Sequence, residues 1–163
     1  MNENIGYLQT ILQEQWQGFW AMNYGIEREQ LPTLKKMSAN PYAVVVSGFR
    51  RTGKSTLMRQ LAQHLGENSF YYVNFEDERF LNFTPQQWNA LYQAMLETYG
   101  ERKIFIIDEV QNIAGWERFV RRFTENGFKF YLTGSNAQLL SRELGTKLTG
   151  QHLSLEVFPC TSQ

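Results

Sequence analysis

One nine-residue stretch constrains this chain more than any other feature. Residues 48–56 are Gly-Phe-Arg-Arg-Thr-Gly-Lys-Ser-Thr and fit the pattern G-x-x-x-x-G-K-[ST]. A β-branched apolar run, 42–47, precedes them, and residues 57–65 after them carry apolar side chains at helical spacing. Strand, glycine-rich loop and helix, in this order, form the context in which the pattern binds phosphate. The sequence therefore predicts a phosphate-binding loop.

The residue types in this loop suit a nucleotide. Gly48 and Gly53 allow backbone conformations that a side chain would forbid, so loop N–H groups can face an anion at the positive end of the next helix. Lys54 would place its charge on the β- and γ-phosphates, and the Ser55 hydroxyl would ligate Mg²⁺. The other loop residues in the predicted nucleotide-binding set are Arg50, Arg51, Thr52 and Thr56. The two arginines can reach phosphate or another subunit, although loop arginines are more often surface groups.

A second pattern lies further along the chain. Residues 103–109 predict a buried strand that ends in the carboxylates Asp108 and Glu109. In a parallel sheet, ligand-binding groups gather at the carboxyl ends of strands. We expect Asp108 to hold Mg²⁺ directly or through water, and Glu109 to polarise an attacking water as general base. The alternative is a solvated acidic turn after a core strand.

Small polar and charged residues supply weaker signals. Ser135 and Asn136 follow a strand, and either can hydrogen-bond the γ-phosphate or the attacking water, with Asn136 slightly preferred. The alternative for both is an ordinary helix N-cap. The acidic run 76–78 also ends a strand, where one carboxylate could face the nucleotide, but such a run is more typical of a solvated loop. The arginines within 118–122 are more typical of a solvated helix face than of a nucleic-acid contact.

Strands and helices alternate along the chain, which predicts an α/β fold with a mainly parallel sheet. Strands are predicted at 42–47, 69–75, 103–109, 128–133 and 152–158, and helices at 57–65, 84–99, 115–126 and 136–144. An amphipathic helix over 4–22 and a short helix from Pro32 precede them. We therefore divide the chain into an N-terminal helical extension, 1–40, packed on a core, 41–163.

Length and charge narrow the class further. The 163 residues suffice for one domain. Basic and acidic residues both number 16, so no net charge draws the chain to nucleic acid or membrane. No apolar run is as long as a membrane span, which takes about 18 residues, and no secretory signal is visible. We therefore expect a cytoplasmic protein. Cys160, the single cysteine, excludes an internal disulfide and is more typical of an incidental thiol.

Six segments together resemble a known family. They are residues 25–28 (Gly-Ile-Glu-Arg), 47–56, 72–79, 107–113, 115–117 and 132–141. In this order they are similar to P-loop ATPases of the AAA/ASCE type, and more narrowly to bacterial and archaeal AAA-domain ATP-binding proteins that usually carry a C-terminal domain of unknown function. The resemblance implies a three-layer αβα sandwich with a five-stranded sheet and the P-loop strand central. It also implies binding of ATP, rather than GTP, with Mg²⁺, and places Arg28 near the nucleotide edge.

Two departures from the family pattern bear on activity. The family usually has a Gly-Arg pair before the last strand, and here the pair is Gly150-Gln151. An arginine that would stabilise the γ-phosphate is then missing, which would impair transition-state stabilisation. The chain also stops at Gln163, where relatives continue into a lid-like region and a second domain. We therefore expect a truncated product that lacks the part defining partner and output.

Together these features favour an ATPase whose hydrolysis drives a conformational or assembly switch. A nucleotide-binding interaction module with little turnover is the alternative, and the missing arginine and short C-terminus favour it. A small-molecule kinase comes third, because the sequence offers neither an acceptor pocket nor a closing lid. AAA-type ATPases often use an arginine from a neighbouring subunit, so the resemblance also allows a homo-oligomer or a protein partner.

Overall fold

The computed structural model describes residues 2–48, 53–135 and 152–157. Its centre is a five-stranded sheet in the order β2–β3–β4–β1–β5, in which every pair is parallel. The strands are β1 (Ala43–Ser47), β2 (Phe70–Asn74), β3 (Ile104–Asp108), β4 (Lys129–Gly134) and β5 (His152–Glu156). The predicted parallel sheet is confirmed, and each predicted strand is present. The P-loop strand β1 lies inside the sheet between β4 and β5, but the middle strand is β4, so the expected central place of β1 is corrected by one position.

The helices also follow the predicted order. They are α1 (Asn2–Ala21), α2 (Leu31–Met37), α3 (Lys54–Leu65), α4 (Trp88–Tyr99) and α5 (Trp116–Thr124), with 3-10 turns η1 (Glu78–Phe80), η2 (Pro85–Gln87) and η3 (Val110–Asn112). The helix predicted over 84–99 begins as the 3-10 turn η2, where the Gln87 Oε1 accepts the backbone N–H of Thr84 at 2.7 Å. The helix predicted over 136–144 lies outside the described residues.

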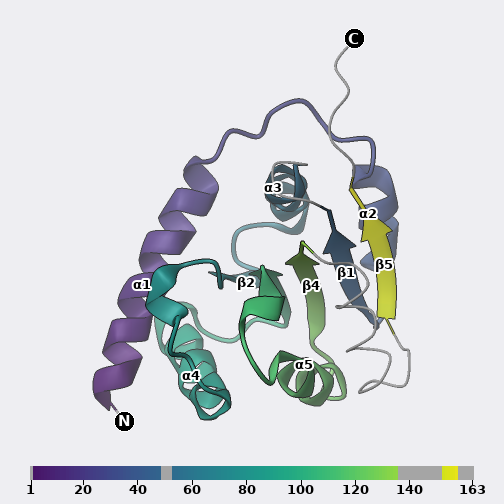
Figure 1. The fold of residues 1–163 in the computed structure, drawn as a ribbon. Coiled ribbons are helices and arrows are strands. Elements are labelled where there is room, and N and C mark those ends of the chain that lie inside the picture. Colours follow the sequence, from purple (N-terminus) through teal and green to yellow (C-terminus); the bar gives the residue numbers. More distant parts are fainter. Residues whose placement is uncertain (1, 49–52, 136–151, 158–163) are drawn as a thin grey trace.

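Alternating side chains along the strands build one hydrophobic core on each face of the sheet. One core joins α4 and α5 to the first half of α1, around residues such as Trp88, Phe105 and Phe119. The other joins α2 and α3 to the opposite face, around Val46 and Leu57. The result is the three-layer αβα sandwich that the family resemblance implies, with the layers visible in Figure 1.

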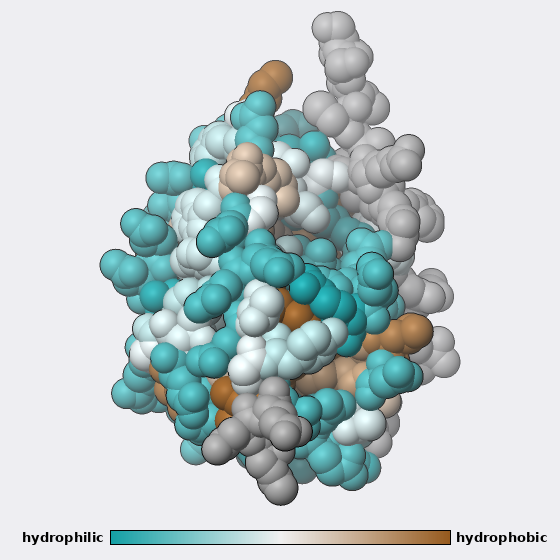
Figure 2. Space-filling model, turned by 90° about the vertical axis from the view of Figure 1, so that its left-hand side faces the viewer, coloured by the Kyte–Doolittle hydropathy of each residue, from teal (hydrophilic) through white to brown (hydrophobic). Residues whose placement is uncertain are grey.

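The N-terminal helix α1 lies against the edge strand β2 (Figure 1). The Gln15 side chain pairs with the strand backbone, since its Oε1 accepts the Asn74 N–H and its Nε2 donates to the Asn74 C=O, both at 2.9 Å. An edge strand otherwise presents unpaired backbone groups, so this contact closes part of the edge. The face of the molecule along α1 is mostly hydrophilic (Figure 2). Within the described ranges, no helix combines the length and apolar character that crossing a membrane requires.

An ionic cluster also ties α1 to the loop after β2. Arg79 donates to Asp77 at 2.8 Å and to Glu14 of α1 at 2.7 Å, and Gln15 donates to Asp77 at 3.2 Å. The hydrogen bonds from Arg79 lower the pKa of Asp77 to about 2, against the opposing effect of partial burial. Asp77 thus belongs to a structural cluster.

We expect acid to weaken this cluster in a defined pH window. A carboxyl group with a lowered pKa stabilises the fold fully above its ordinary pKa of 3.8, and this contribution is lost as the pH falls toward about 2. Asp77→Asn should therefore lower the free energy of unfolding at neutral pH by about 1–2 kcal/mol. The difference from wild type should shrink in acid. Urea unfolding at several pH values measures it, with Glu125→Gln at an exposed ion pair as control. A pH-independent difference would contradict the prediction.

Candidate active site

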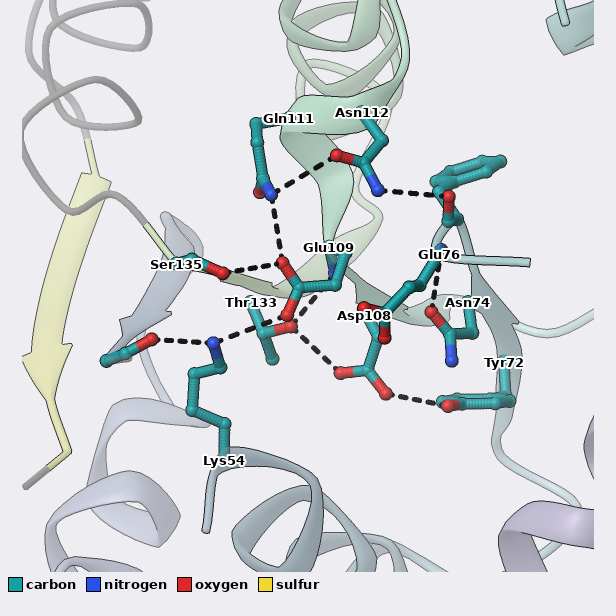
Figure 3. A network of polar contacts seen from close by, with 12 residues as sticks. Lys54, Tyr72, Asn74, Glu76, Asp108, Glu109, Gln111, Asn112, Thr133 and Ser135 are labelled. Atoms are coloured by element: carbon teal, nitrogen blue, oxygen red, sulfur yellow. Dashed lines mark hydrogen bonds and ion pairs between the residues drawn. The ribbon is translucent and has the colours of Figure 1, made fainter. Parts of the chain in front are cut away.

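Part of the predicted site set meets where the carboxyl ends of β3 and β4 approach the start of α3 (Figure 3). Asp108 ends β3, Glu109 follows it, and Ser135 follows β4. Gly53 precedes α3 with φ +98°, a left-handed conformation that glycine adopts readily. A Cβ atom at this position would also collide with the guanidinium of Arg28. The fold therefore places Arg28 directly against Gly53, at the end of the predicted phosphate-binding loop.

Lys54, the first residue of α3, connects the loop to the carboxylate of Glu109. Its Nζ donates to the Gly48 C=O at 2.6 Å and lies 3.3 Å from Glu109 Oε2. The side chains of Lys54 and Glu109 are only 6% and 12% exposed, so this ion pair is largely shielded from water. A bound phosphate would compete directly with Glu109 for the ammonium group.

Glu109 is held by contacts on both carboxylate oxygens. Besides the pair with Lys54, its Oε1 accepts hydrogen bonds from Gln111 Nε2 at 2.9 Å and Ser135 Oγ at 3.1 Å. Burial raises the pKa of Glu109, but the hydrogen bond from Gln111 and the charge of Lys54 outweigh it, and the pKa lies below its ordinary value. Glu109 is therefore ionised at neutral pH.

The backbone of Glu109 is strained. With φ +54° and ψ +50°, it is the only described residue other than glycine that has a positive φ. This left-handed conformation costs an ordinary residue about 1–2 kcal/mol, and its N–H donates to Thr133 Oγ1 at 3.0 Å. Strain of this kind is commonly stored at functional positions.

The Asp108 carboxylate is buried beside this group and accepts two hydrogen bonds. Thr133 Oγ1 donates to Oδ1 at 2.9 Å, and the Tyr72 hydroxyl donates to Oδ2 at 2.6 Å. Burial raises the pKa of Asp108, while these two hydrogen bonds oppose the rise. Burial, together with the charge of Asp108, raises the pKa of Tyr72 well above its ordinary value, so the phenol stays protonated.

The donor set fits a magnesium–nucleotide ligand. In the described ranges, no three His, Cys, Asp or Glu side chains converge in a group that could hold a metal ion. Mg²⁺ suits such a site, because proteins usually hold it with one or two oxygen ligands, water and substrate phosphates. Asp108 offers a carboxylate, and Ser55 offers an exposed hydroxyl in the first turn of α3.

The structure thus brings together Gly48, Lys54, Glu109 and Ser135, with Asp108 beside them (Figure 3). Thr56 lies further along α3 and faces Gly25. A Cβ atom built on Gly25 would be 3.6 Å from the methyl group of Thr56. Four predicted site residues fall outside the described residues: Arg50, Arg51, Thr52 and Asn136.

Four supporting residues were not predicted from the sequence: Gln60, Tyr72, Gln111 and Thr133. Gln60 is 1% exposed on the inward face of α3. Its Nε2 donates to the backbone C=O groups of Tyr24 and Ile26 at 2.8 and 2.9 Å, and its Oε1 accepts the Arg28 N–H at 2.9 Å. A glutamine between the apolar positions 57 and 61 is a signal that could have revealed it.

Gln60→Leu should release segment 24–28 from α3. The change leaves two partly buried C=O groups and one N–H without their hydrogen-bond partner, each at a cost of about 1–3 kcal/mol unless the segment moves into water. We expect a loss of unfolding free energy of about 2–4 kcal/mol and faster amide exchange in this segment. Urea unfolding and hydrogen exchange measure the two effects. Gln63→Leu, at an exposed position of the same helix, is the matched control. Equal behaviour of the two variants would show that Gln60 does not hold segment 24–28 on α3.

A parallel sheet with a glycine-containing segment that leads into α3 at Lys54, and with carboxylates at the end of β3, defines an α/β fold of the P-loop NTPase class. A family model described as an AAA domain, AAA_14, matches residues 40–163, and the chain belongs to this family. The family resemblance inferred from the sequence is thereby confirmed.

Two curated relatives are similar in sequence, and both are described as uncharacterised. A Methanocaldococcus jannaschii protein is 37% identical over 115 residues, which cover 71% of this chain and 26% of the relative. A Haemophilus influenzae protein is 32% identical over 142 residues, which cover 82% of this chain and 36% of the relative. The chain therefore spans only about a quarter to a third of the length of these relatives.

Solved structures share the fold at low sequence identity. A Walker-type ATPase of Pyrococcus abyssi is 19% identical with a TM-score of 0.55, over 83% of this chain and 54% of that one. AMPPCP-bound DnaA from Aquifex aeolicus is 12% identical with a TM-score of 0.54, over 81% and 47%. The Aeropyrum pernix ORC1 protein in complex with DNA is 15% identical with a TM-score of 0.56, over 83% and 47%. At these identities the likeness shows the fold alone.

Proposed function

We propose that this chain is the ATP-hydrolysing domain of an AAA-type ATPase and that hydrolysis drives a conformational or assembly switch in a larger protein. The observation that carries the proposal is the shielded contact of Lys54 with Glu109 at the start of α3. In this contact, a cation that can bind phosphate lies beside a carboxylate that can take a proton from water. A cytoplasmic location, with its supply of ATP and Mg²⁺, suits this function.

Binding would begin with an exchange of ionic partners at Lys54. The ammonium group turns from Glu109 to the β- and γ-phosphates, while the N-terminus of α3 attracts the same anion. Arg28, held against Gly53, lies at the nucleotide edge. Ser55 and Asp108 would hold Mg²⁺, Asp108 directly or through water. When bound, this ion neutralises phosphate charge and orients the oxygens.

The same exchange prepares Glu109 for catalysis. Once Lys54 faces phosphate, Glu109 loses a neighbour that lowers its pKa and becomes a stronger base. Water attacks the γ-phosphorus, its proton passes to a Glu109 oxygen, and the bond to the β–γ bridging oxygen breaks to release ADP. Ser135 and Gln111 keep the carboxylate oriented, and Asn136 would sense the γ-phosphate.

A nucleotide-binding module with little turnover is the second candidate. The observation that favours it is the saturation of Glu109 by Lys54, Gln111 and Ser135, since a carboxylate with three partners is a poor base until one of them leaves. An arginine or other residue from a partner subunit would then be needed for efficient turnover.

Product analysis tests the proposal. The chain is incubated with Mg·ATP or Mg·GTP without any acceptor, and nucleotides and phosphate are quantified. We expect ADP and phosphate in equal amounts, with ATP preferred. Products that appear only when an acceptor molecule is added would indicate a kinase, and a chain that binds neither nucleotide would refute the proposal.

A further inference from the structure

Tyr72 is a buried polar residue that the proposed chemistry does not use. It lies opposite Ile106 in the register of β2 and β3, so it shares a sheet face with Asp108 two residues further along. Only 6% of Tyr72 is exposed, and its hydroxyl reaches diagonally to Asp108 Oδ2 at 2.6 Å (Figure 3).

Two neighbouring strands together fix the Asp108 carboxylate. Thr133 from β4 donates to Oδ1 and Tyr72 from β2 donates to Oδ2. With one hydrogen bond on each oxygen, the carboxylate cannot turn about its Cβ–Cγ bond without losing both. Asp108 is 3% exposed, so bulk water is poorly placed to replace a lost donor.

The ring of Tyr72 is itself supported by the N-terminal helix. Phe19 of α1 stacks on it with ring centroids 4.2 Å apart and an interplanar angle of 27°. Phe19 is 2% exposed and belongs to the core on the α3 side of the sheet. A chain of contacts therefore runs from α1 through Tyr72 to Asp108.

We propose that Tyr72 is a positioning residue that orients Asp108 for Mg²⁺, and that Phe19 of α1 supports it. The inference rests on the proposed function. Mg²⁺ demands nearly ideal octahedral geometry, and partners that orient a metal ligand typically change metal affinity by about 10–100-fold. Tyr72→Phe keeps the ring and its stacking but removes the donor. We expect it to raise the Mg²⁺ concentration for half-maximal nucleotide binding about tenfold, and to leave metal-free nucleotide binding unchanged.

Tyr71 supplies a matched control on the same strand. It points to the opposite face, is fully buried, and its hydroxyl donates to the Gly100 C=O at 2.5 Å and accepts the Arg102 N–H at 2.9 Å. Tyr71→Phe therefore also removes a hydrogen-bonded hydroxyl from a buried tyrosine. If Tyr72 served only stability, both variants would behave alike in a magnesium titration.

The experiment titrates MgCl₂ into each full chain mixed with ATP carrying a fluorescent N-methylanthraniloyl group. The inference is supported if the Mg²⁺ concentration for half-maximal nucleotide binding rises in Tyr72→Phe and not in Tyr71→Phe. Wild-type binding that depends on Mg²⁺, with equal curves for both variants, overturns the inference and leaves the proposed function intact. A wild type that binds no nucleotide overturns both. Should Tyr72→Phe not fold, Phe19→Leu provides the test, because loosening the ring should shift the same curve in the same direction, and an unshifted curve would overturn the inference.

Discussion

Glu109→Gln is expected to slow phosphate release from saturating Mg·ATP by about 10²–10³-fold and to leave ATP bound. The amide can still accept the hydrogen bond from Ser135, so the local geometry survives, but it cannot take a proton from water. ATP affinity should rise, because Lys54 no longer has an anionic partner at 3.3 Å that competes with phosphate. Phosphate release and equilibrium binding, measured on one preparation, separate these two effects.

The control for this variant is Glu101→Gln. Glu101 is 70% exposed and pairs only loosely with Lys103 at 3.5 Å, so its replacement should change neither quantity. Turnover by Glu109→Gln at the wild-type rate would show that another group accepts the proton. A loss of ATP binding in this variant would instead show that Glu109 contributes to the architecture of the site.

Lys54→Met should weaken ATP binding by about 100-fold or more. Methionine keeps the length and the apolar stem of lysine, so the main change is the loss of the charge that would face the phosphates. The variant should also be less stable by about 1–3 kcal/mol, because Glu109, 12% exposed, loses its cationic partner and the Gly48 C=O loses its donor. Fluorescent nucleotide binding and urea unfolding measure the two losses.

A double variant distinguishes the two roles of Lys54. Lys54→Met with Glu109→Gln removes both charges of the pair, so stability should recover in large part while ATP binding stays weak. Lys36→Met, an exposed lysine in the last turn of α2, is the control. ATP binding by Lys54→Met close to that of wild type would contradict the proposed phosphate site.

Much of this fold could be predicted because its signals are local. The glycine loop, the apolar run before it and the carboxylates at the end of β3 each lie within a few residues. Each of these signals indicates a strand, a loop or a helix independently of the rest of the chain. Parallel order follows from the alternation of strands and helices. Lys54 and Glu109 were expected in one site, because a parallel sheet brings the carboxyl ends of its strands to one edge. The direct ion pair between them was not predicted.

The supporting contacts could not be read from the sequence because their partners are distant in the chain. Tyr72 and Asp108 are 36 residues apart, as are Tyr24 and Gln60, and Gln15 is 59 residues from Asn74. Such pairs depend on how the layers pack, and a tyrosine in a strand or a glutamine in a helix has many other uses. The roles of Arg50, Arg51, Thr52 and Asn136, outside the described residues, stay predictions.

The most direct test of ATP hydrolysis by this chain is the time course of phosphate release by the wild type, with saturating ATP in Mg²⁺ and in EDTA. We expect continuous release in Mg²⁺, without any acceptor, and none in EDTA. Tight Mg²⁺-dependent binding of ATP with no release would contradict hydrolysis by this chain and identify a nucleotide-binding module in its place.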